Sequence, residues 1–244
     1  MKLQILAQHK QEANEQYWWH LFKDFNVDKK VADFQKSRLY NIFVKNIGRE
    51  QKILDAGCGT GKITFSLLKS GYAVTGLDYS KQLLSKVKTA VPEHATKFVF
   101  GDVRKLPFKK ETFDVYISPG VVEHFQKNEQ DKIIREAHRI LKRNGKTLFI
   151  VPYINLLSQV QAKRILKKEA IKKAKGIPFY QYRYSEPAVI SLLKENSFEP
   201  EKTYLLGLHD TKVFGIKLIP KFLQNNTFLL KIFGTTICVL ARKV

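Results

Sequence analysis

Short apolar runs alternate along the chain with longer segments in which apolar residues recur at helical spacing. Nearly continuous apolar strands separated by helices are typical of parallel sheets whose two faces are both covered. We therefore predict an α/β fold: a doubly wound, mostly parallel sheet of seven strands with helices on both faces. The expected strands are residues 53–54, 72–77, 97–101, 115–118, 147–151, 203–206 and 236–241.

Helical spacing marks the segments between these strands. Residues 11–47 are expected to be helical. Aromatic residues cluster between Tyr17 and Phe25, and apolar residues recur at roughly helical spacing from Val31 to Phe43. A helix from Lys62 should stop at Gly71, and the helix over 128–143 at Asn144-Gly145, because glycine and asparagine end helices readily. We interpret residues 181–185 as a loop before a helix over 186–195.

A glycine-rich turn joins the first of these strands to the helix that follows it. Its sequence is Asp55-Ala56-Gly57-Cys58-Gly59-Thr60-Gly61. At such a turn the backbone can approach a ligand closely, and the first N–H groups of the helix point at it. A phosphate-binding P-loop is excluded because its first glycine would fall on Ala56 and its hydroxyl on Ile63. A dinucleotide fingerprint is excluded because Lys62 takes the place of its third glycine.

The pattern that remains, Asp-x-Gly-x-Gly-x-Gly, resembles the first motif of the class I S-adenosylmethionine (SAM)-dependent methyltransferases. Over residues 45–152 the chain is similar to the small-molecule and lipid-precursor type of that family, methyltransferase type 11-like. The resemblance implies a Rossmann-like sheet and SAM as cofactor. An acid at the head of the motif would repel a pyrophosphate but suits the ammonium and sulfonium of SAM. The cofactor contacts implied at the turn are Asp55, Gly57, Cys58, Gly59 and Gly61.

Further candidate cofactor residues follow the next three strands. Asp78 lies 21 residues beyond Gly57, a distance at which doubly wound folds place a carboxylate against ribose hydroxyls. An N-cap of the next helix is the alternative role for Asp78. Tyr79 is placed to cover one face of the adenine, and the resemblance implies that Asp102 accepts a hydrogen bond from the adenine amino group. The other candidates are Val103, then Ser118, Pro119 and Gly120 after the fourth strand, and Tyr17 and Trp18 at the pocket border.

His124 is the candidate for the chemistry, because it follows the fourth strand beside the expected methyl position. A histidine that only holds its loop is the alternative. Methyl transfer from a sulfonium needs donor and acceptor in line and water excluded, with a proton acceptor only when the nucleophile must lose a proton. We therefore predict a SAM-dependent methyltransferase for a small-molecule or lipid-linked acceptor. The candidate substrate residues are Tyr153, Tyr182, Arg183 and Tyr184.

The charge of the chain keeps other functions open. Its 244 residues include 43 Lys and Arg against 22 Asp and Glu, and the net charge of +21 favours an anionic partner: RNA, a membrane surface or an acidic substrate. Methylation of a base is disfavoured, because Ser118-Pro119-Gly120 differs from the Asn/Asp-Pro-Pro motif and neither cysteine lies near that loop in sequence. An RNA methyltransferase acting at other atoms, and a non-catalytic SAM-binding protein, are the alternatives.

The length and the lack of a low-complexity linker predict one domain over residues 1–244. We divide it into an N-terminal helical extension (1–48), a cofactor-binding core (49–152), a lid insertion (153–185) and the rest of the sheet (186–244), with an insertion at 211–234. The second insertion combines cations with large apolar residues, which suggests peripheral contact with an anionic membrane. We expect a cytoplasmic protein with free thiols, no signal peptide and no structural metal.

Overall fold

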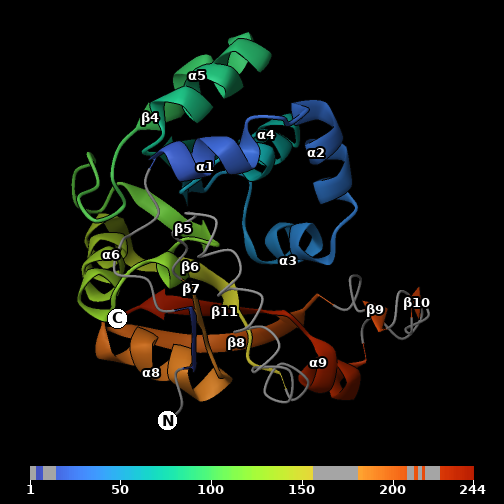
Figure 1. The fold of residues 1–244 in the computed structure, drawn as a ribbon. Helices are drawn as coiled ribbons and strands as arrows, with labels where there is room; N and C mark the ends of the chain where they lie inside the picture. Colours follow the sequence, from blue (N-terminus) through green and yellow to red (C-terminus); the bar gives the residue numbers. More distant parts are fainter. Residues whose placement is uncertain (1–3, 8–14, 156–180, 208–211, 214–215, 218–225) are drawn as a thin grey trace.

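The computed structural model describes residues 4–7, 15–155, 181–207, 212–213, 216–217 and 226–244. Its centre is a seven-stranded sheet in the order β4-β3-β2-β5-β6-β11-β8 (Figure 1). The strands from β4 to β6 pair in parallel, whereas β11 runs antiparallel to both of its neighbours. The doubly wound, mostly parallel sheet is therefore confirmed. Its strands are β2 (Lys52–Ala56), β3 (Ala73–Asp78), β4 (Phe98–Phe100), β5 (Phe113–Pro119), β6 (Leu141–Pro152), β8 (Phe198–Leu206) and β11 (Thr236–Lys243).

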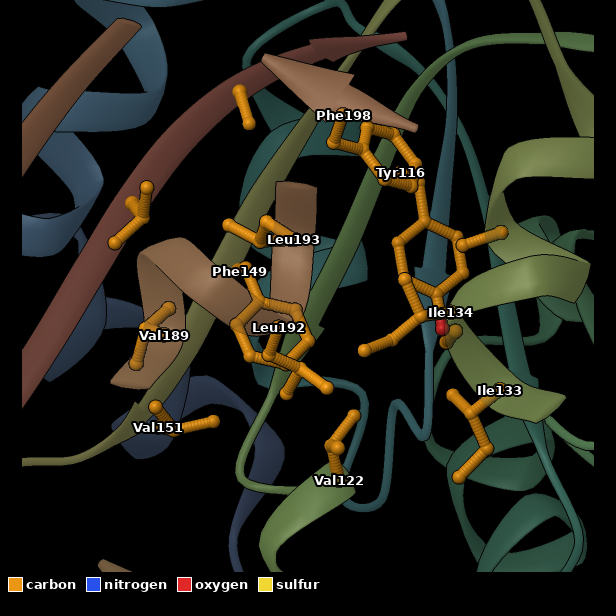
Figure 2. Close-up of a cluster of buried hydrophobic side chains, with 14 of the residues drawn as sticks. Tyr116, Val122, Ile133, Ile134, Phe149, Val151, Val189, Leu192, Leu193 and Phe198 are labelled. Atoms are coloured by element: carbon orange, nitrogen blue, oxygen red, sulfur yellow. The ribbon is translucent and has the colours of Figure 1, made fainter. Parts of the chain in front are cut away.

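Both faces of the sheet are covered, which explains why its strands are nearly continuous in apolar residues. Successive side chains of β5 point to opposite faces: Tyr116 joins one core cluster, and Val115 and Ile117 join another. The Tyr116 cluster is closed by α6 (Lys127–Ile140) and α8 (Glu186–Glu195). In Figure 2, Val189, Leu192 and Leu193 of α8 lie around Phe149, and Ile133 and Ile134 of α6 lie on the Tyr116 side. The opposite cluster is closed by α3 (Arg38–Asn46) and α4 (Lys62–Lys69).

The N-terminal region forms three helices, α1 (Glu15–Phe22), α2 (Val27–Gln35) and α3. The breaks have a local cause: the side chain of Asn26 accepts a hydrogen bond from the Lys29 N–H, and that of Ser37 from the Tyr40 N–H, so each begins a new helix. α1 lies beside α5 (Lys81–Ala90), close to the carboxyl ends of β3 and β4 (Figure 1). The expected helical extension is confirmed in the described residues, and its first helix reaches the cofactor side of the sheet.

Two local predictions are wrong. The loop expected over 181–185 begins with strand β7 (Gln181–Arg183), which pairs antiparallel with β1 (Gln4–Ala7), a strand that the hydrophobic pattern did not reveal. The helix expected to reach Asn144 ends at Ile140, because Leu141 already pairs with Phe113 of β5. Asn144, with φ of 61°, instead lies within an irregular stretch of β6, where the register to β5 shifts.

The remaining elements lie on the connections. Two short 3₁₀ helices, η1 (Pro92–Lys97) and η2 (Val122–His124), follow α5 and β5, and β9 (Lys212–Val213) pairs with β10 (Ile216–Lys217). α9 (Thr227–Phe233) buries Leu230 and leaves Phe228 70% exposed. Most of the predicted lid insertion and much of the 211–234 insertion lie outside the described residues. Within the described part, no helix is long and apolar enough to cross a membrane.

Candidate functional site

A cavity of about 430 Å³ lies where β2, β3, β4 and β5 end. In open α/β sheets, ligands bind outside the carboxyl ends of the strands, and cavities of this size are typical of small-molecule sites. Several predicted cofactor residues from the four strand ends line it together: Asp55, Gly57, Cys58, Gly59, Asp78, Tyr79, Asp102, Val103, Pro119 and Gly120. Residues about 65 positions apart in sequence therefore meet in one cavity.

The glycine turn is pinned to the neighbouring strand by its own backbone. The N–H groups of Gly57 and Cys58 both donate to the Leu77 carbonyl, at 2.7 and 2.9 Å. Gly57 has a φ of 79°, and a Cβ atom there would overlap Val121 on the loop after β5. Gly61 differs, because a Cβ there would meet Val87 and Phe98 in the core. Gly57 thus shapes the cavity, while Gly61 allows α4 to pack.

Asp55 brings a buried carboxylate to the floor of the cavity. Its Oδ2 accepts hydrogen bonds from the Thr64 N–H at 3.2 Å and the Thr64 hydroxyl at 2.7 Å, which fixes the carboxylate against the first turn of α4. Its Oδ1 has no hydrogen-bond partner among the described residues. Burial raises the pKa of Asp55 to about 6, although the two bonds from Thr64 oppose the shift. A cationic group of a ligand would favour the ionised carboxylate and use the open oxygen.

Asp78 connects the glycine turn to the end of β3. Its Oδ2 accepts a hydrogen bond from the Gly59 N–H at 2.8 Å, and its Oδ1 accepts one from the Ser80 N–H at 2.9 Å. Burial raises its pKa, and the nearby Glu15 charge adds to the rise. The N-cap of α5 is Ser80, whose hydroxyl accepts from the Leu83 N–H at 3.2 Å. The alternative role of Asp78 as the N-cap is therefore wrong, and its carboxylate lies in the cavity wall.

The far end of the cavity is formed by the loop after β4. Asp102 lines it, and the Arg104 guanidinium holds the Asp102 carboxylate through Nε–Oδ2 and Nη2–Oδ2 contacts of 3.0 and 2.7 Å. Burial would raise the pKa of Asp102, but the hydrogen bonds and charge of Arg104 outweigh it and lower the pKa. Tyr79, directly after β3, is 38% exposed and lines the same cavity. A polar edge beside an aromatic ring suits a heteroaromatic base.

The N-terminal helices contribute the cavity's outer wall. Trp18, Leu21 and Phe22 of α1 line it, together with Lys30 of α2. The Trp18 ring meets the His124 ring edge to face, with centroids 4.8 Å apart and planes at 72°. His124 also lines the cavity but is only 8% exposed. A ligand that reaches this wall would therefore meet mainly apolar side chains and one imidazole.

Some predicted site residues are not among those that line the cavity. Ser118 is fully buried beneath it, and Gly61 faces the core. Tyr17 belongs to α1, but its side chain lies outside what the structure describes. The four predicted substrate residues lie at the end of β6 and in or just after β7, where Tyr182 and Tyr184 are buried in the core. None of the four, Tyr153, Tyr182, Arg183 and Tyr184, lines the cavity. Their role in substrate binding stays a prediction.

Comparison with known proteins agrees with this geometry. Residues 54–149, which carry all four strand ends of the site, match the model of a family described as a methyltransferase domain. Over these residues the chain carries a methyltransferase domain, in line with its resemblance to the SAM-dependent methyltransferases.

Relatives of this chain include enzymes named for quinone-related substrates. It is 33% identical over 153 residues to 2-methyl-6-phytyl-1,4-hydroquinone methyltransferase of Arabidopsis thaliana, covering 59% of this chain and 43% of the relative. It is 28% identical over 205 residues to the ubiquinone biosynthesis O-methyltransferase of Pelagibacter ubique, covering 80% of this chain and 82% of that one. The chain thus spans less than half the length of the hydroquinone methyltransferases that it matches.

Solved structures show the same fold. A SAM-dependent methyltransferase from Methanosarcina mazei superposes with a TM-score of 0.65 at 21% identity, covering 84% of this chain and 98% of that one. A 1,6-didemethyltoxoflavin-N1-methyltransferase from Burkholderia thailandensis, with a TM-score of 0.60 at 16% identity, covers 99% of this chain and 95% of that one. At these identities the likeness concerns the fold.

Sequence reasoning missed several residues that line the cavity. Lys30 and Lys62 line it at the Asp55 end, and Val121 and Phe125 line it beside His124. Lys62 had a local signal, its place directly after the last glycine, but was used only to exclude other motifs. Lys30 had none, because its position depends on how α2 packs against α4.

Glu123, next to His124, is an acid buried in the core. It is 2% exposed, its Oε2 has no hydrogen-bond partner in the described part of the chain, and burial raises its pKa to about 8. Its Oε1 lies 3.9 Å from the His124 Nε2. Because the folded state holds this proton and the unfolded state releases it near pH 4.5, stability is lost as pH rises from about 4.5 to 8.

We expect Glu123→Gln to remove that loss. The variant should match the wild type near pH 4.5 and exceed it by about 3–5 kcal/mol near pH 8, by the free energy of a pKa shift. Urea unfolding at a series of pH values measures the difference. Glu93→Gln, at an exposed position, is the matched control and should follow the wild-type curve. A Glu123→Gln curve that stays parallel to the wild type would show that Glu123 is ionised in the fold.

Proposed function

We propose that this protein binds SAM in the cavity at the strand ends and transfers its methyl group to a small-molecule acceptor. The observation that carries the proposal is the meeting of the Asp55, Asp78 and Asp102 carboxylates, from three strand ends, in one cavity of about 430 Å³. SAM supplies a methyl group already activated by its sulfonium. The residues fit this molecule, because Asp55 offers an open buried oxygen and a Cβ at Gly59 would meet no atom within 4 Å.

Each wall of the cavity has a part in this proposal. Asp78, held by the Gly59 and Ser80 N–H groups, keeps its remaining lone pairs for the ribose hydroxyls. Tyr79 covers the adenine, and Asp102 and Val103 face its edge. The backbone of Gly57, Cys58, Pro119 and Gly120 surrounds the methionine part. The roles in these assignments are those that the family resemblance implied. Here they are given to the residues that line the cavity.

His124 takes the proton that the acceptor loses when its nucleophile is a hydroxyl. The support is its position in the cavity wall against Trp18, where the imidazole lines the cavity and the neighbouring Glu123 does not. A positioned general base typically contributes a factor of 10²–10⁴. His124→Gln should therefore lower turnover by about that factor while the SAM affinity changes less than threefold.

The acceptor in this proposal is an aromatic molecule with an apolar tail. Relatives are named for 2-methyl-6-phytyl-1,4-hydroquinone, demethylmenaquinone and ubiquinone biosynthesis. The side chains of Trp18, Leu21 and Phe22 give the cavity an apolar wall that suits such a ring. Contact with an anionic membrane, where such acceptors lie, is part of the proposal; it rests on the net charge of +21 and on Phe228, which is 70% exposed. Co-sedimentation with anionic vesicles, compared with RNA binding, measures this contact.

One experiment tests the function in two steps. Calorimetry with SAM and with NAD should give binding to SAM alone, and tighter binding of NAD would overturn the cofactor. The protein is then incubated with labelled SAM and a set of prenylated and unprenylated hydroquinones, and with RNA as the alternative acceptor. Label in a hydroquinone, reduced in His124→Gln, supports the proposal. SAM binding with no transfer to any acceptor would favour the non-catalytic alternative, and label in RNA would favour the nucleic-acid one.

A further inference from the structure

Two lysines meet at the Asp55 end of the cavity without an acidic partner. Lys30 comes from α2, outside the sheet core, and Lys62 is the first residue of α4, directly after the glycine turn. α2 packs along α4, so the two side chains reach the cavity from adjoining helices. Among the described residues neither lysine forms an ion pair, in contrast to Arg104, the other cation of the cavity, which is bound to Asp102. The cavity thus has two lysines at one end that form no ion pair among the described residues.

The electrostatics of this end favour an anion. The pKa of Lys62 is lowered, first because its ammonium is partly withdrawn from water and then because the Lys30 charge repels it; the attraction of Asp55 only opposes this. The Lys62 side chain as a whole is exposed to solvent. The burial that lowers its pKa therefore concerns its ammonium end. α4 also directs the positive end of its dipole here, because its N-cap is Gly61, which has no side chain to cap the first turn; within that turn Asp55 accepts from the Thr64 N–H. An anion between the two ammonium groups would relieve the repulsion.

Asp55 supplies the opposite charge a short distance away. It is fully buried, lines the cavity, and keeps Oδ1 without a partner in the described part of the chain. A negative group with an open oxygen beside a pair of positive groups is complementary to a zwitterion whose ammonium and carboxylate are one carbon apart. An α-amino acid has this arrangement, and the methionine part of SAM is one.

Resting on the proposed function, we infer that Lys30 and Lys62 hold the α-carboxylate of the cofactor while Asp55 Oδ1 accepts from its ammonium. In this arrangement the N-terminal helical region covers the cofactor site and also supplies one of its binding residues, Lys30. Lys30 and Lys62 also become the residues that distinguish the intact cofactor from analogues without the carboxylate.

The test compares SAM with decarboxylated SAM, which keeps the adenosine, sulfonium and ammonium but lacks the carboxylate. The wild type should bind SAM at least tenfold more tightly, because a charge-assisted hydrogen bond is among the stronger polar contacts. Lys30→Gln and Lys62→Gln should each weaken SAM about tenfold and leave decarboxylated SAM within a factor of three. The double variant should bind both ligands equally. Calorimetry at fixed ionic strength gives all these affinities without turnover.

Lys29→Gln is the matched control. Lys29 neighbours Lys30 on α2, is exposed and does not line the cavity, so its variant changes the net charge by the same amount. It should bind both ligands as the wild type does. Thermal unfolding of each variant verifies that the fold is kept.

The outcomes separate this inference from the proposed function. Wild-type protein that binds both ligands equally would overturn the carboxylate site and leave the cofactor assignment standing. A parallel weakening of both ligands in Lys30→Gln and Lys62→Gln would show a general field effect, which also overturns it. Binding of neither ligand to the wild type would instead refute the proposed function. Loss of the preference for SAM in the lysine variants alone supports the inference.

Discussion

Asp78→Ala is expected to weaken SAM binding by about 10²-fold or more. The substitution removes the acceptor proposed for the ribose hydroxyls, and it also frees the Gly59 and Ser80 N–H groups that the carboxylate now holds at 2.8 and 2.9 Å. Loss of one charge-assisted hydrogen bond costs on the order of 1.5–3 kcal/mol, which alone is about a tenfold to hundredfold change in affinity. Release of the glycine turn adds to that loss.

Two further variants identify the cause. Asp78→Asn keeps one oxygen acceptor and should bind SAM with an affinity between those of the wild type and Asp78→Ala. Asp114 offers a control, because its carboxylate also accepts from a backbone N–H, that of Lys52 at 2.8 Å, and pairs with Lys142, but lies outside the cavity wall. Asp114→Ala should lower the unfolding temperature and leave the calorimetric affinity unchanged. An Asp78→Ala protein that is folded and binds SAM normally would remove Asp78 from the site.

The parts of the fold that could be predicted from sequence have local signals. The β2–α4 turn is marked by three glycines in five residues, and the end of β3 by an acid 21 residues after Gly57. The strands are apolar throughout because both faces of the sheet are buried, as the two clusters around β5 show. Such signals depend on residue types and spacings along the chain, so the sequence alone is sufficient to find them.

The parts that could not be predicted depend on contacts between distant segments. β1 pairs with β7, more than 170 residues away, and neither strand has more than four residues. Asn144-Gly145 is a usual helix end, but pairing of Leu141 with β5 ends α6 earlier, so tertiary structure overrode a local signal. Lys30 reaches the cavity only because α2 packs on α4. Each of these facts requires the assembled fold.

The two glycines at the start of the turn should respond differently to alanine, although both have positive φ. Gly57→Ala places its Cβ against Val121, and Gly59→Ala places its Cβ in open space. At both positions the left-handed conformation costs an L-residue roughly 1–2 kcal/mol. Overlap in a packed site adds about 1–3 kcal/mol, so Gly57→Ala should be the less stable variant by that amount.

Thermal unfolding and calorimetry together separate the two effects. Gly57→Ala should lower the unfolding temperature by roughly 5–15 °C, since 1 kcal/mol corresponds to about 2–4 °C in a chain of this size. Gly59→Ala should lower it much less but weaken SAM strongly, because its methyl group would occupy cavity space proposed for the cofactor. Val121→Ala removes the overlapping group, so it should restore part of the stability of Gly57→Ala but none of the affinity of Gly59→Ala. Equal unfolding temperatures for the two glycine variants would mean that Val121 yields without cost, and that only the backbone conformation requires glycine at position 57.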